Sequence, residues 1–440
     1  MYRLPGPATP LGHARWGLGL ACHPTETLLA AYERWGPVSA LGWGPFRWVL
    51  MLGRDANELI LSTRAKDFTW REAFASLIPV DGDTALVVSD GADHARRRRL
   101  VQPAFALRRI HGYAPIVIEE VHRTLDTWTP GDRIDLYAEL RRAVRRIAIR
   151  SLFGDRLGDR ADELGDRLQA ALDFANIPPF PGRDLDLPGS PFRRAMKERR
   201  RADAIVFDEI SRRRAEGTDE GDLLSALIKA QDSDGSVLND QELRDQVVSL
   251  IAAGYETTAA LVGWALYAIL SRPQVEASLR AELGETFGDG PIDEGHLDSC
   301  PYLHGVISET LRLHSPAGFA GRKLHADIDF AGHTVPAGTM VIYSAYVTHR
   351  QPELWPDPLV FRPQRWIGPD GRPVDPQPYA FVPFGGGYRR CIGFAMATLE
   401  AKIIVAETLR RTHLRLETKD VKATGMATVT PGGGLPATVA

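Results

Sequence analysis

The sequence predicts a mainly α-helical protein with a smaller β-rich lobe, expected as a single domain over residues 1–440. Its strongest signal is residues 239–272, a long apolar helix that the capping box from Asn239 to Glu242 opens and Pro273 stops. Several other segments place apolar residues at helical spacing. Runs typical of strands are confined to three places, near residues 38–53, 323–345 and 414–440.

Caps, breakers and periodicity place the other elements in order. A Pro-rich irregular lead precedes a helix over 25–34, and a helix over 55–63 has Asp55 as its expected cap. Residues 68–88 lack a clear period and are predicted as a long loop with a short helix, and loops of this length are usually functional. Further helices are predicted over 113–130, 135–153, 160–177, 193–214 and 302–314. Strands are predicted as a hairpin of 38–41 with 47–52, as short strands at 328–330 and 339–344, and as a closing hairpin of 414–417 with 427–429.

The middle of the long helix is apolar enough to raise the question of a membrane span. Residues 247–270 would cross a bilayer by length alone. Glu256 lies near the centre of this stretch, where an acid is costly in lipid. A buried core helix is therefore predicted, and the N-terminus adds no apolar leader. No membrane anchor is expected.

Composition excludes several classes of function. A net charge of −3 over 440 residues gives no reason to expect nucleic acid as a partner. The three cysteines, Cys22, Cys300 and Cys391, are too far apart in sequence to suggest a zinc motif or a disulfide framework. These features fit a reducing compartment and predict a cytoplasmic protein.

One cysteine, Cys391, occupies a distinctive position. It follows three consecutive glycines and two arginines in the segment 381–393 and directly precedes a predicted helix. Backbone N–H groups and the helix dipole at such a junction are expected to lower the pKa of the thiol. The thiolate could serve as a nucleophile, a zinc ligand or an iron ligand, and a buried structural cysteine is the alternative. Because no base or second thiolate lies nearby in the sequence, a planar macrocycle lying against the loop suits the pattern best.

The loop resembles the haem-binding loop of cytochrome P-450 monooxygenases, with six matching positions within ten residues. The resemblance implies haem b, with Cys391 as its thiolate ligand and the long helix 239–272 over the haem. It also implies a set of residues around this cofactor: His94, Arg98, Ala253, Gly254, Thr257, Arg322, Pro383, Phe384, Gly385, Arg389, Ile392, Gly393 and Ala397.

Three further motifs match the family in the expected order. His94 and Arg98 share a helix face and are expected to act as cationic donors to a haem propionate, although a solvated basic face or a nucleic-acid patch would give the same pattern. Glu256 and Thr257 follow two small residues, and the resemblance implies that they deliver protons during oxygen activation. The alternative is a purely structural role, in which Thr257 hydrogen-bonds to a carbonyl of its own helix and Glu256 pairs with an arginine.

The third motif is the pair Glu309 and Arg312, three residues apart on a predicted helix. The resemblance implies that Arg365 completes a structural network with them. Gln364 and Trp366 depart from the residues that the family often has beside this arginine, which puts the neighbouring packing in question.

The resemblance implies a soluble bacterial monooxygenase that inserts one oxygen atom of O2 into a lipophilic small molecule, by C–H hydroxylation or epoxidation. Electrons are expected from NAD(P)H through a separate ferredoxin or flavodoxin with its reductase, and Arg390, Arg96, Arg97 and Arg99 are candidate docking charges. A monomer is expected. The alternatives are a haem-thiolate sensor without turnover and a peroxide-driven peroxygenase or isomerase on the same fold.

The substrate pocket is predicted from apolar residues in segments that would surround the haem, with 70–86 and 177–191 as a mobile lid. The predicted wall residues are Trp70, Phe74, Leu77, Ile78, Leu86, Phe174, Ile177, Phe180, Ala252, Ala317, Phe319 and Met426.

Overall fold

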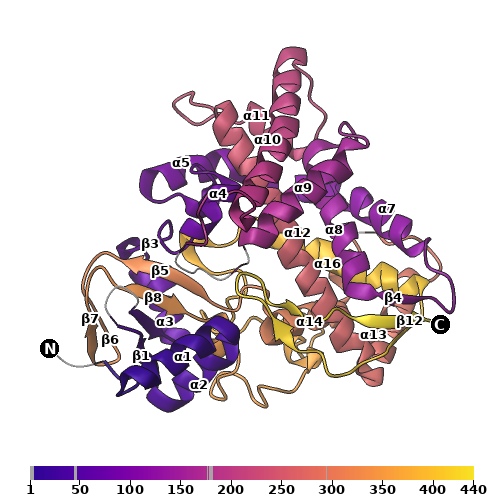
Figure 1. Ribbon diagram of the computed structural model, residues 1–440. Coiled ribbons are helices and arrows are strands. Elements are labelled where there is room, and N and C mark those ends of the chain that lie inside the picture. The colour runs from indigo at the N-terminus through magenta and orange to yellow at the C-terminus, as the bar shows by residue number, and fades with distance from the viewer. Residues whose placement is uncertain (1–3, 44–46, 176, 178–181, 294) are drawn as a thin grey trace.

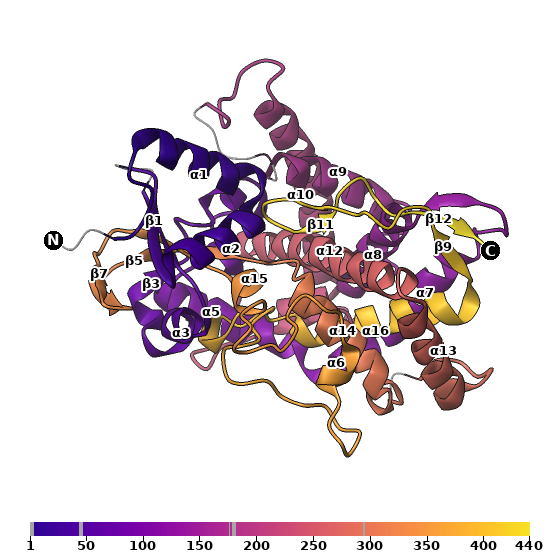
Figure 2. The same ribbon diagram turned by 90° about the horizontal axis from the view of Figure 1, so that it is seen from below.

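The structure is a computed structural model that describes residues 4–43, 47–175, 177, 182–293 and 295–440. Helices make up most of the molecule, and a β-rich lobe lies at the lower left of Figure 1. The first described residue, Leu4, packs into an apolar cluster of this lobe, and the C-terminus lies at the far end of the helical part (Figures 1 and 2). The predicted fold class, mainly α with a smaller β-rich lobe, is confirmed.

The long central helix is α12, Asp240–Leu270, which Figure 2 shows crossing the middle of the molecule. Asn239 Oδ1 accepts from the backbone N–H of Glu242 at 2.9 Å, and the Glu242 carboxylate accepts from the N–H of Asn239 at 3.1 Å. The predicted capping box is therefore formed. Within the described residues α12 is the one helix apolar and long enough to cross a bilayer, but 72% of its apolar window is buried in the protein. Most of the apolar side chains of α12 are thus covered by other parts of the protein.

Other helices surround α12 and fall close to their predicted positions. Those in contact with it include α8, α14 and α16. The larger helices are α2 (Pro24–Trp35), α5 (Gly91–Val101), α7 (Ala114–Leu125), α8 (Leu136–Phe153), α9 (Arg160–Ala175), α10 (Pro191–Glu216), α13 (Pro273–Phe287), α14 (Pro301–Leu313) and α16 (Phe394–Arg411). Short ones are α3 (Arg54–Glu58), α4 (Ile78–Asp81), α6 (Leu107–Gly112), α11 (Leu223–Lys229) and α15 (Ala345–Thr348).

The β-rich lobe is built on a five-stranded sheet with the order β1-β2-β8-β5-β3. The strands β2 and β8 are parallel, and the other neighbours are antiparallel. The bounds are β1 Val38–Leu41, β2 Trp48–Met51, β3 Phe68–Thr69, β5 Ala320–Leu324 and β8 Met340–Tyr343. A small hairpin of β6 (Ile328–Phe330) and β7 (His333–Val335) lies outside this sheet.

Three local predictions are wrong. The Pro-rich lead contains a helix, α1 (Pro10–Cys22), whose start is capped by Thr9 and accommodates a proline at its first position. The cap position of α3 is Gly53, so Asp55 lies inside the helix. The strand β9 (Leu414–Leu416) pairs with β12 (Pro436–Val439), not with residues 427–429.

The closing strands therefore form two small sheets. In one, β12 lies between β9 and β4 (Arg133–Asp135). In the other, β10 (Ala423–Thr424) pairs with β11 (Thr430–Pro431), which leaves residues 425–429 as the connecting turn. This turn is tied to the core, because Val429 accepts from the Trp264 indole at 3.0 Å and donates its N–H to Pro316 O at 2.8 Å.

Candidate active site

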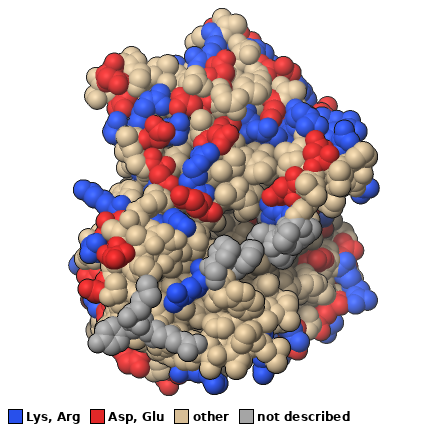
Figure 3. Space-filling view, turned by 60° about the vertical axis from the view of Figure 1, so that its left-hand side comes forward, with Lys and Arg blue, Asp and Glu red and all other residues tan. Residues whose placement is uncertain are grey.

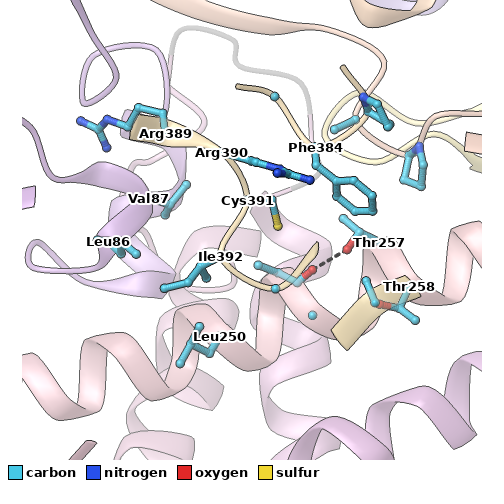
Figure 4. A pocket seen from close by; sticks show the side chains of 18 of the residues that line it. Leu86, Val87, Leu250, Thr257, Thr258, Phe384, Arg389, Arg390, Cys391 and Ile392 are labelled. Atoms are coloured by element: carbon cyan, nitrogen blue, oxygen red, sulfur yellow. Dashed lines mark hydrogen bonds between the residues drawn. The ribbon is translucent and has the colours of Figure 1, made fainter. Parts of the chain in front are cut away.

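A cavity of about 390 Å³ lies between α12 and the loop that carries Cys391. Most of its lining is apolar, and Figure 4 shows the sulfur of Cys391 and the side chain of Thr257 pointing into it from these two elements. A cavity of this size and character is typical of sites for small molecules and cofactors.

Glycines shape the Cys391 loop. Gly385 and Gly387 have positive φ angles of 68° and 59°, which other residues rarely adopt. A Cβ on Gly387 would also lie 2.0 Å from the carbonyl oxygen of Leu61. The loop closes with a hydrogen bond of 2.9 Å from the Cys391 N–H to Phe384 O, and α16 begins three residues after the cysteine. The backbone is therefore held close to its neighbours, and the thiol points into the cavity.

The Cys391 side chain is exposed, and it belongs to the cavity lining, with its sulfur pointing into the cavity (Figure 4). Burial raises the pKa of its thiol, and the backbone N–H of Gly393 and the charges of Arg98 and Arg390 only partly oppose this. The result is opposite to the predicted lowering of the pKa, because desolvation outweighs the helix terminus. In the structure as it stands the neutral thiol is therefore favoured, and a positive partner in the cavity would favour the thiolate.

The α12 wall of the cavity is lined by Ala253, Gly254 and Thr257. The hydroxyl of Thr257 donates to the carbonyl oxygen of Ala253 at 2.6 Å, as the dashed line in Figure 4 shows. A Cβ added to Gly254 would meet no atom within 4 Å, so open space lies beside the helix at this point.

Glu256 does not line the cavity, although it precedes Thr257 in the sequence. Consecutive helical residues point about 100° apart, and Glu256 faces α8, where it forms an ion pair with Arg141. Gln169 of α9 lies 3.4 Å from the same carboxylate oxygen, and Tyr255 donates to Gln169 at 2.5 Å. The acid therefore belongs to a network on the side of α12 remote from the cavity.

A cluster of cationic side chains lies against Trp70 at the cavity. The guanidinium of Arg322 lies 3.4 Å from the Trp70 ring centroid, and that of Arg389 lies 5.0 Å from it. Arg389 also pairs with Asp90 at 2.5 Å, while its Nε is buried without a hydrogen-bond partner among the described residues. Arg322 is buried behind the lining and donates to the hydroxyl of Tyr343 at 3.0 Å.

His94 and Arg98 line the cavity beside this cluster. Burial, with the charges of Arg389 and Arg98, lowers the pKa of His94 to about 3. His94 is therefore neutral in this structure and can only donate as a neutral imidazole, so only Arg98 of the predicted cationic pair is charged. Arg98 donates to the carbonyl oxygen of Arg390 at 2.8 Å, which links α5 to the Cys391 loop.

The structural network predicted around Glu309 is formed. The carboxylate is fully buried and accepts from Arg312 at 2.8 Å and from Arg365 at 2.9 Å. The indole of Trp366 and the backbone N–H of Arg362 also donate to it, each at 2.9 Å. The departure at position 366 thus adds a donor to the carboxylate.

His349 connects this network to the Cys391 segment, and sequence reasoning missed it. Arg312 donates to the His349 carbonyl oxygen at 2.7 Å, and Nδ1 of His349 lies 3.1 Å from the carbonyl oxygen of Arg312. Nε2 accepts from the backbone N–H of Val382 at 3.0 Å, which places the ring proton on Nδ1. Burial lowers the pKa of His349 to about 3, so this neutral form persists at physiological pH.

A second residue missed from the sequence is Glu400 on α16. It lines the cavity, and no hydrogen bond or ion pair to it is found within the described residues. Burial raises its pKa to about 8. Glu400 is the seventh residue of α16, just under two turns into the helix, and its sequence position alone does not show that it faces the cavity.

The predicted residues divide into those that line the cavity and those that do not. The residues that line it are Cys391, His94, Arg98, Ala253, Gly254, Thr257, Pro383, Phe384, Gly385, Arg389, Ile392, Gly393 and Ala397, with the predicted wall residues Trp70, Phe74, Leu86, Ala317 and Phe319. Predicted residues outside the lining are Glu256, Arg322, Leu77, Ile78, Phe174, Ile177, Ala252 and Met426. Phe180 lies outside the described residues.

Neighbouring contacts explain some of these differences. Phe174 packs against Phe192 and under the guanidinium of Arg183, which holds its ring away from the cavity. In the turn after β10 the lining residue is Ala427 and not Met426.

Comparison with known proteins decides the family. A model of the family described as Cytochrome P450 matches residues 5–433. The chain belongs to the cytochrome P450 family. This P450 is 41% identical over 414 residues to "Putative cytochrome P450 139" of Mycobacterium tuberculosis (strain ATCC 25618 / H37Rv), an alignment that covers 93% of this chain and 96% of that protein.

Two further P450 relatives extend the comparison. The chain is 34% identical to "Cyclooctat-9-en-7-ol 5-monooxygenase" of Streptomyces melanosporofaciens, over 93% of this chain and 89% of that protein. The solved structure "Retinoic acid bound cyanobacterial CYP120A1" superposes with a TM-score of 0.85 at 26% identity, over 94% of this chain and 96% of that one. The predicted family, fold and enzyme class are confirmed: the chain is an oxygenase, and its family uses haem iron and O2.

The residues of this cavity fit a haem. Cys391 offers one sulfur from a loop whose glycines let the backbone lie close to a neighbouring segment of the chain. On the opposite wall the small residues Ala253 and Gly254 leave room. The buried Nε of Arg389, without a partner among the described residues, suits a carboxylate of the macrocycle. No cluster of three metal-ligating side chains is found in the described part of the chain, so a lone thiolate is the ligand set that this site offers.

Proposed function

We propose that the chain, acting as a single domain and a monomer in a bacterial cytoplasm, is a haem-thiolate monooxygenase. It inserts one oxygen atom of O2 into a lipophilic small molecule, by C–H hydroxylation or epoxidation. The observation that carries the proposal is the placement of Cys391 and Thr257 on opposing elements of one apolar cavity.

In this proposal haem b lies in the cavity with Cys391 as its thiolate ligand. When bound, a haem-thiolate centre supplies the activation of dioxygen that the side chains cannot perform. Arg98, Arg322 and Arg389 hold its carboxylates, with His94 as a neutral donor. The unpartnered Nε of Arg389 and the proximity of Arg322 to the lining residue Tyr343 support this arrangement.

Thr257 is the proposed proton donor of the site. Its hydroxyl faces the cavity and donates its one proton to Ala253 O in this structure, so it would accept a hydrogen bond from a water in the cavity and must turn away from Ala253 O to donate into the cavity. Glu256 acts from the other side of α12, where Arg141 and Gln169 connect it toward solvent. The proposed role of Glu256 is to supply protons from solvent toward Thr257. Its carboxylate does not itself reach the cavity in this structure.

Electrons are proposed to come from NAD(P)H through a separate ferredoxin or flavodoxin with its reductase. The docking charges predicted from sequence are partly neutralised: Arg96 and Arg97 both pair with Glu242, and Arg99 pairs with Asp232. Arg390, whose guanidinium stacks over Phe394 at 3.9 Å, keeps no carboxylate partner among the described residues and remains the strongest candidate.

A lipophilic substrate is supported by the apolar walls that Leu86, Ala317 and Phe319 contribute. It is also supported by two relatives, one named for oxygenating cyclooctat-9-en-7-ol and one solved with retinoic acid, because both compounds are largely hydrocarbon. The structural network of Glu309, Arg312 and Arg365 is proposed to hold the Cys391 segment through His349.

The test is turnover by the haem-loaded enzyme with a surrogate ferredoxin, its reductase and NADPH, against a panel of terpenoid and retinoid lipids under labelled dioxygen. Substrate-dependent NADPH consumption and one labelled oxygen atom in the product are expected. Ligand binding without NADPH consumption would favour a sensor. Product formed from peroxide alone, with Thr257→Ala fully active, would favour a peroxygenase.

A further inference from the structure

The helix α1 presents an apolar face to solvent. Leu11 is 81% exposed and Leu18 is 67% exposed. They lie seven residues apart, which is two helical turns, so they project on the same side. The exposed positions between and beyond them complete this outward face: Ala14, Arg15, Gly17, Ala21 and Cys22. Arg15 is its one charged residue.

The opposite side of α1 is also apolar and is fixed to the protein. Trp16 packs against Trp35 with ring centroids 4.5 Å apart, and Leu20 packs on the apolar cluster around Leu28. A helix that is apolar all round is normally buried. The inner side of α1 meets this expectation, whereas the outer side has no cover from the described part of the chain.

The surroundings of this face are largely apolar, although the adjoining α2 carries two exposed acids, Glu26 and Glu33. Trp43 is 55% exposed, and its ring lies 6.0 Å from that of His13 on α1. Residues 1–25 and 34–54 contain no Asp or Glu, although the chain has 56 of them. In Figure 3 the lower half of the visible face, the height at which α1 and β1 lie in Figure 1, shows few charged side chains. Arg15 and Arg47 are both exposed, so the charge carried by α1 itself and by the segment after Trp43 is positive.

The area of the face favours a lipid surface over a protein as its binding partner. Thirteen helical residues are about 20 Å long, and a helix is about 10 Å wide, so the exposed side covers roughly 200 Å². A specific protein interface needs about 800 Å² from each partner. A bilayer needs neither that area nor matching shape, because one amphipathic helix inserts by burying its apolar side.

We propose that α1 and Trp43 form a peripheral docking face for a bilayer that contains anionic lipid. Leu11 and Leu18 enter the acyl boundary, Trp43 lies at the headgroup level, and Arg15 contacts anionic headgroups. The inner side of α1 connects to the cavity wall, since Phe319 lines the cavity and packs against the same cluster as Leu20. Docking here would place that wall near the phase in which a lipophilic compound dissolves.

The test is flotation of the haem-loaded protein with vesicles of dioleoylphosphatidylcholine and dioleoylphosphatidylglycerol at low salt. The wild-type protein is expected to float with these vesicles and to bind pure phosphatidylcholine more weakly. Leu11→Asp with Leu18→Asp should reduce the partition coefficient by roughly tenfold or more. The matched control is Leu107→Asp with Leu359→Asp, because these leucines are 64% and 70% exposed elsewhere on the surface and should have no effect.

Arg15→Glu provides a second variant that leaves every apolar side chain in place. It is expected to weaken binding to the anionic vesicles several-fold without changing binding to the neutral ones. Absent flotation of the wild-type protein, or equal loss in the α1 and control variants, would overturn the proposal. Concentration-dependent self-association that the α1 variant abolishes, without flotation, would overturn it in favour of a second copy of the chain.

Discussion

Removing the Glu309 carboxylate should destabilise the protein more than any surface substitution. Glu309 accepts hydrogen bonds from Arg312, Arg365, Trp366 and the backbone of Arg362, all between 2.8 and 2.9 Å. Glu309→Ala leaves the fully buried Arg312 as an uncompensated charge. Breaking a buried ion pair from one side costs about 3–5 kcal/mol, a large share of the total stability of a domain.

The assay is thermal unfolding of the haem-loaded protein, followed by circular dichroism and by haem absorbance. An unfolding entropy of about 2.1 cal/mol/K per residue over 440 residues converts a loss of 4 kcal/mol into a fall of about 4 °C in Tm. Haem loss should begin earlier in the variant, because Arg312 also bonds to His349, which holds Val382 before the Cys391 loop. The matched control is Arg133→Ala, which breaks an exposed ion pair with Glu417 and should leave Tm almost unchanged. A Tm for Glu309→Ala within about 1 °C of the control would refute the reasoning.

The same carboxylate should make the protein sensitive to acid. Burial alone would raise the pKa of Glu309, but its arginine partners lower it below the unfolded value. Its contribution to stability is therefore present above about pH 4.3 and is lost as the pH falls through the lowered folded pKa, which acid titration of unfolding would measure. Thr257→Ala should cut product formed per NADPH consumed by roughly tenfold or more while substrate still binds, and unchanged coupling would contradict the proposed donor. Glu400→Gln should become more stable than wild type as the pH rises from about 4.3 to 8, because only the wild-type protein must keep a buried carboxyl protonated. The stability difference should grow by at most about 1.4 kcal/mol per pH unit. A difference independent of pH in denaturant titrations would count against the raised pKa of Glu400. Gly387→Ala should prevent stable haem uptake, because its Cβ would lie 2.0 Å from Leu61 O, and full haem content on purification would argue otherwise.

Much of the fold could be predicted because its signals are local. The capping box at Asn239 and the apolar composition of α12 fix a buried helix without reference to the rest of the chain. The pairing of β9 with β12 could not be predicted, since it joins strands that the turn at 425–429 separates. The helix α1 could not be predicted, because its three glycines and the prolines at and before its start favour irregular structure, whereas Thr9 and tertiary packing of Trp16 stabilise it.

The site was predictable where sequence spacing determines geometry. The Cys391 loop and the Glu309–Arg312 pair depend on short spacings, and both lie as these spacings indicate, whereas Arg365 is 56 residues from Glu309 and was implied only by the family resemblance. The direction of Glu256 and the raised pKa of the thiol depend on what packs around them, which the sequence does not state. The role of His349 could not be predicted either, because its hydrogen-bond partners are 33 and 37 residues away in the chain.

The most direct test of the proposed ligation is the absorption spectrum of the reduced protein under carbon monoxide. Thiolate ligation by Cys391 predicts the red-shifted Soret maximum that distinguishes haem-thiolate proteins from imidazole-ligated ones, and Cys391→His is expected to move the maximum to the imidazole position. An imidazole-type maximum in the intact wild-type protein, or the same spectrum after Cys391→Ala, would contradict the account.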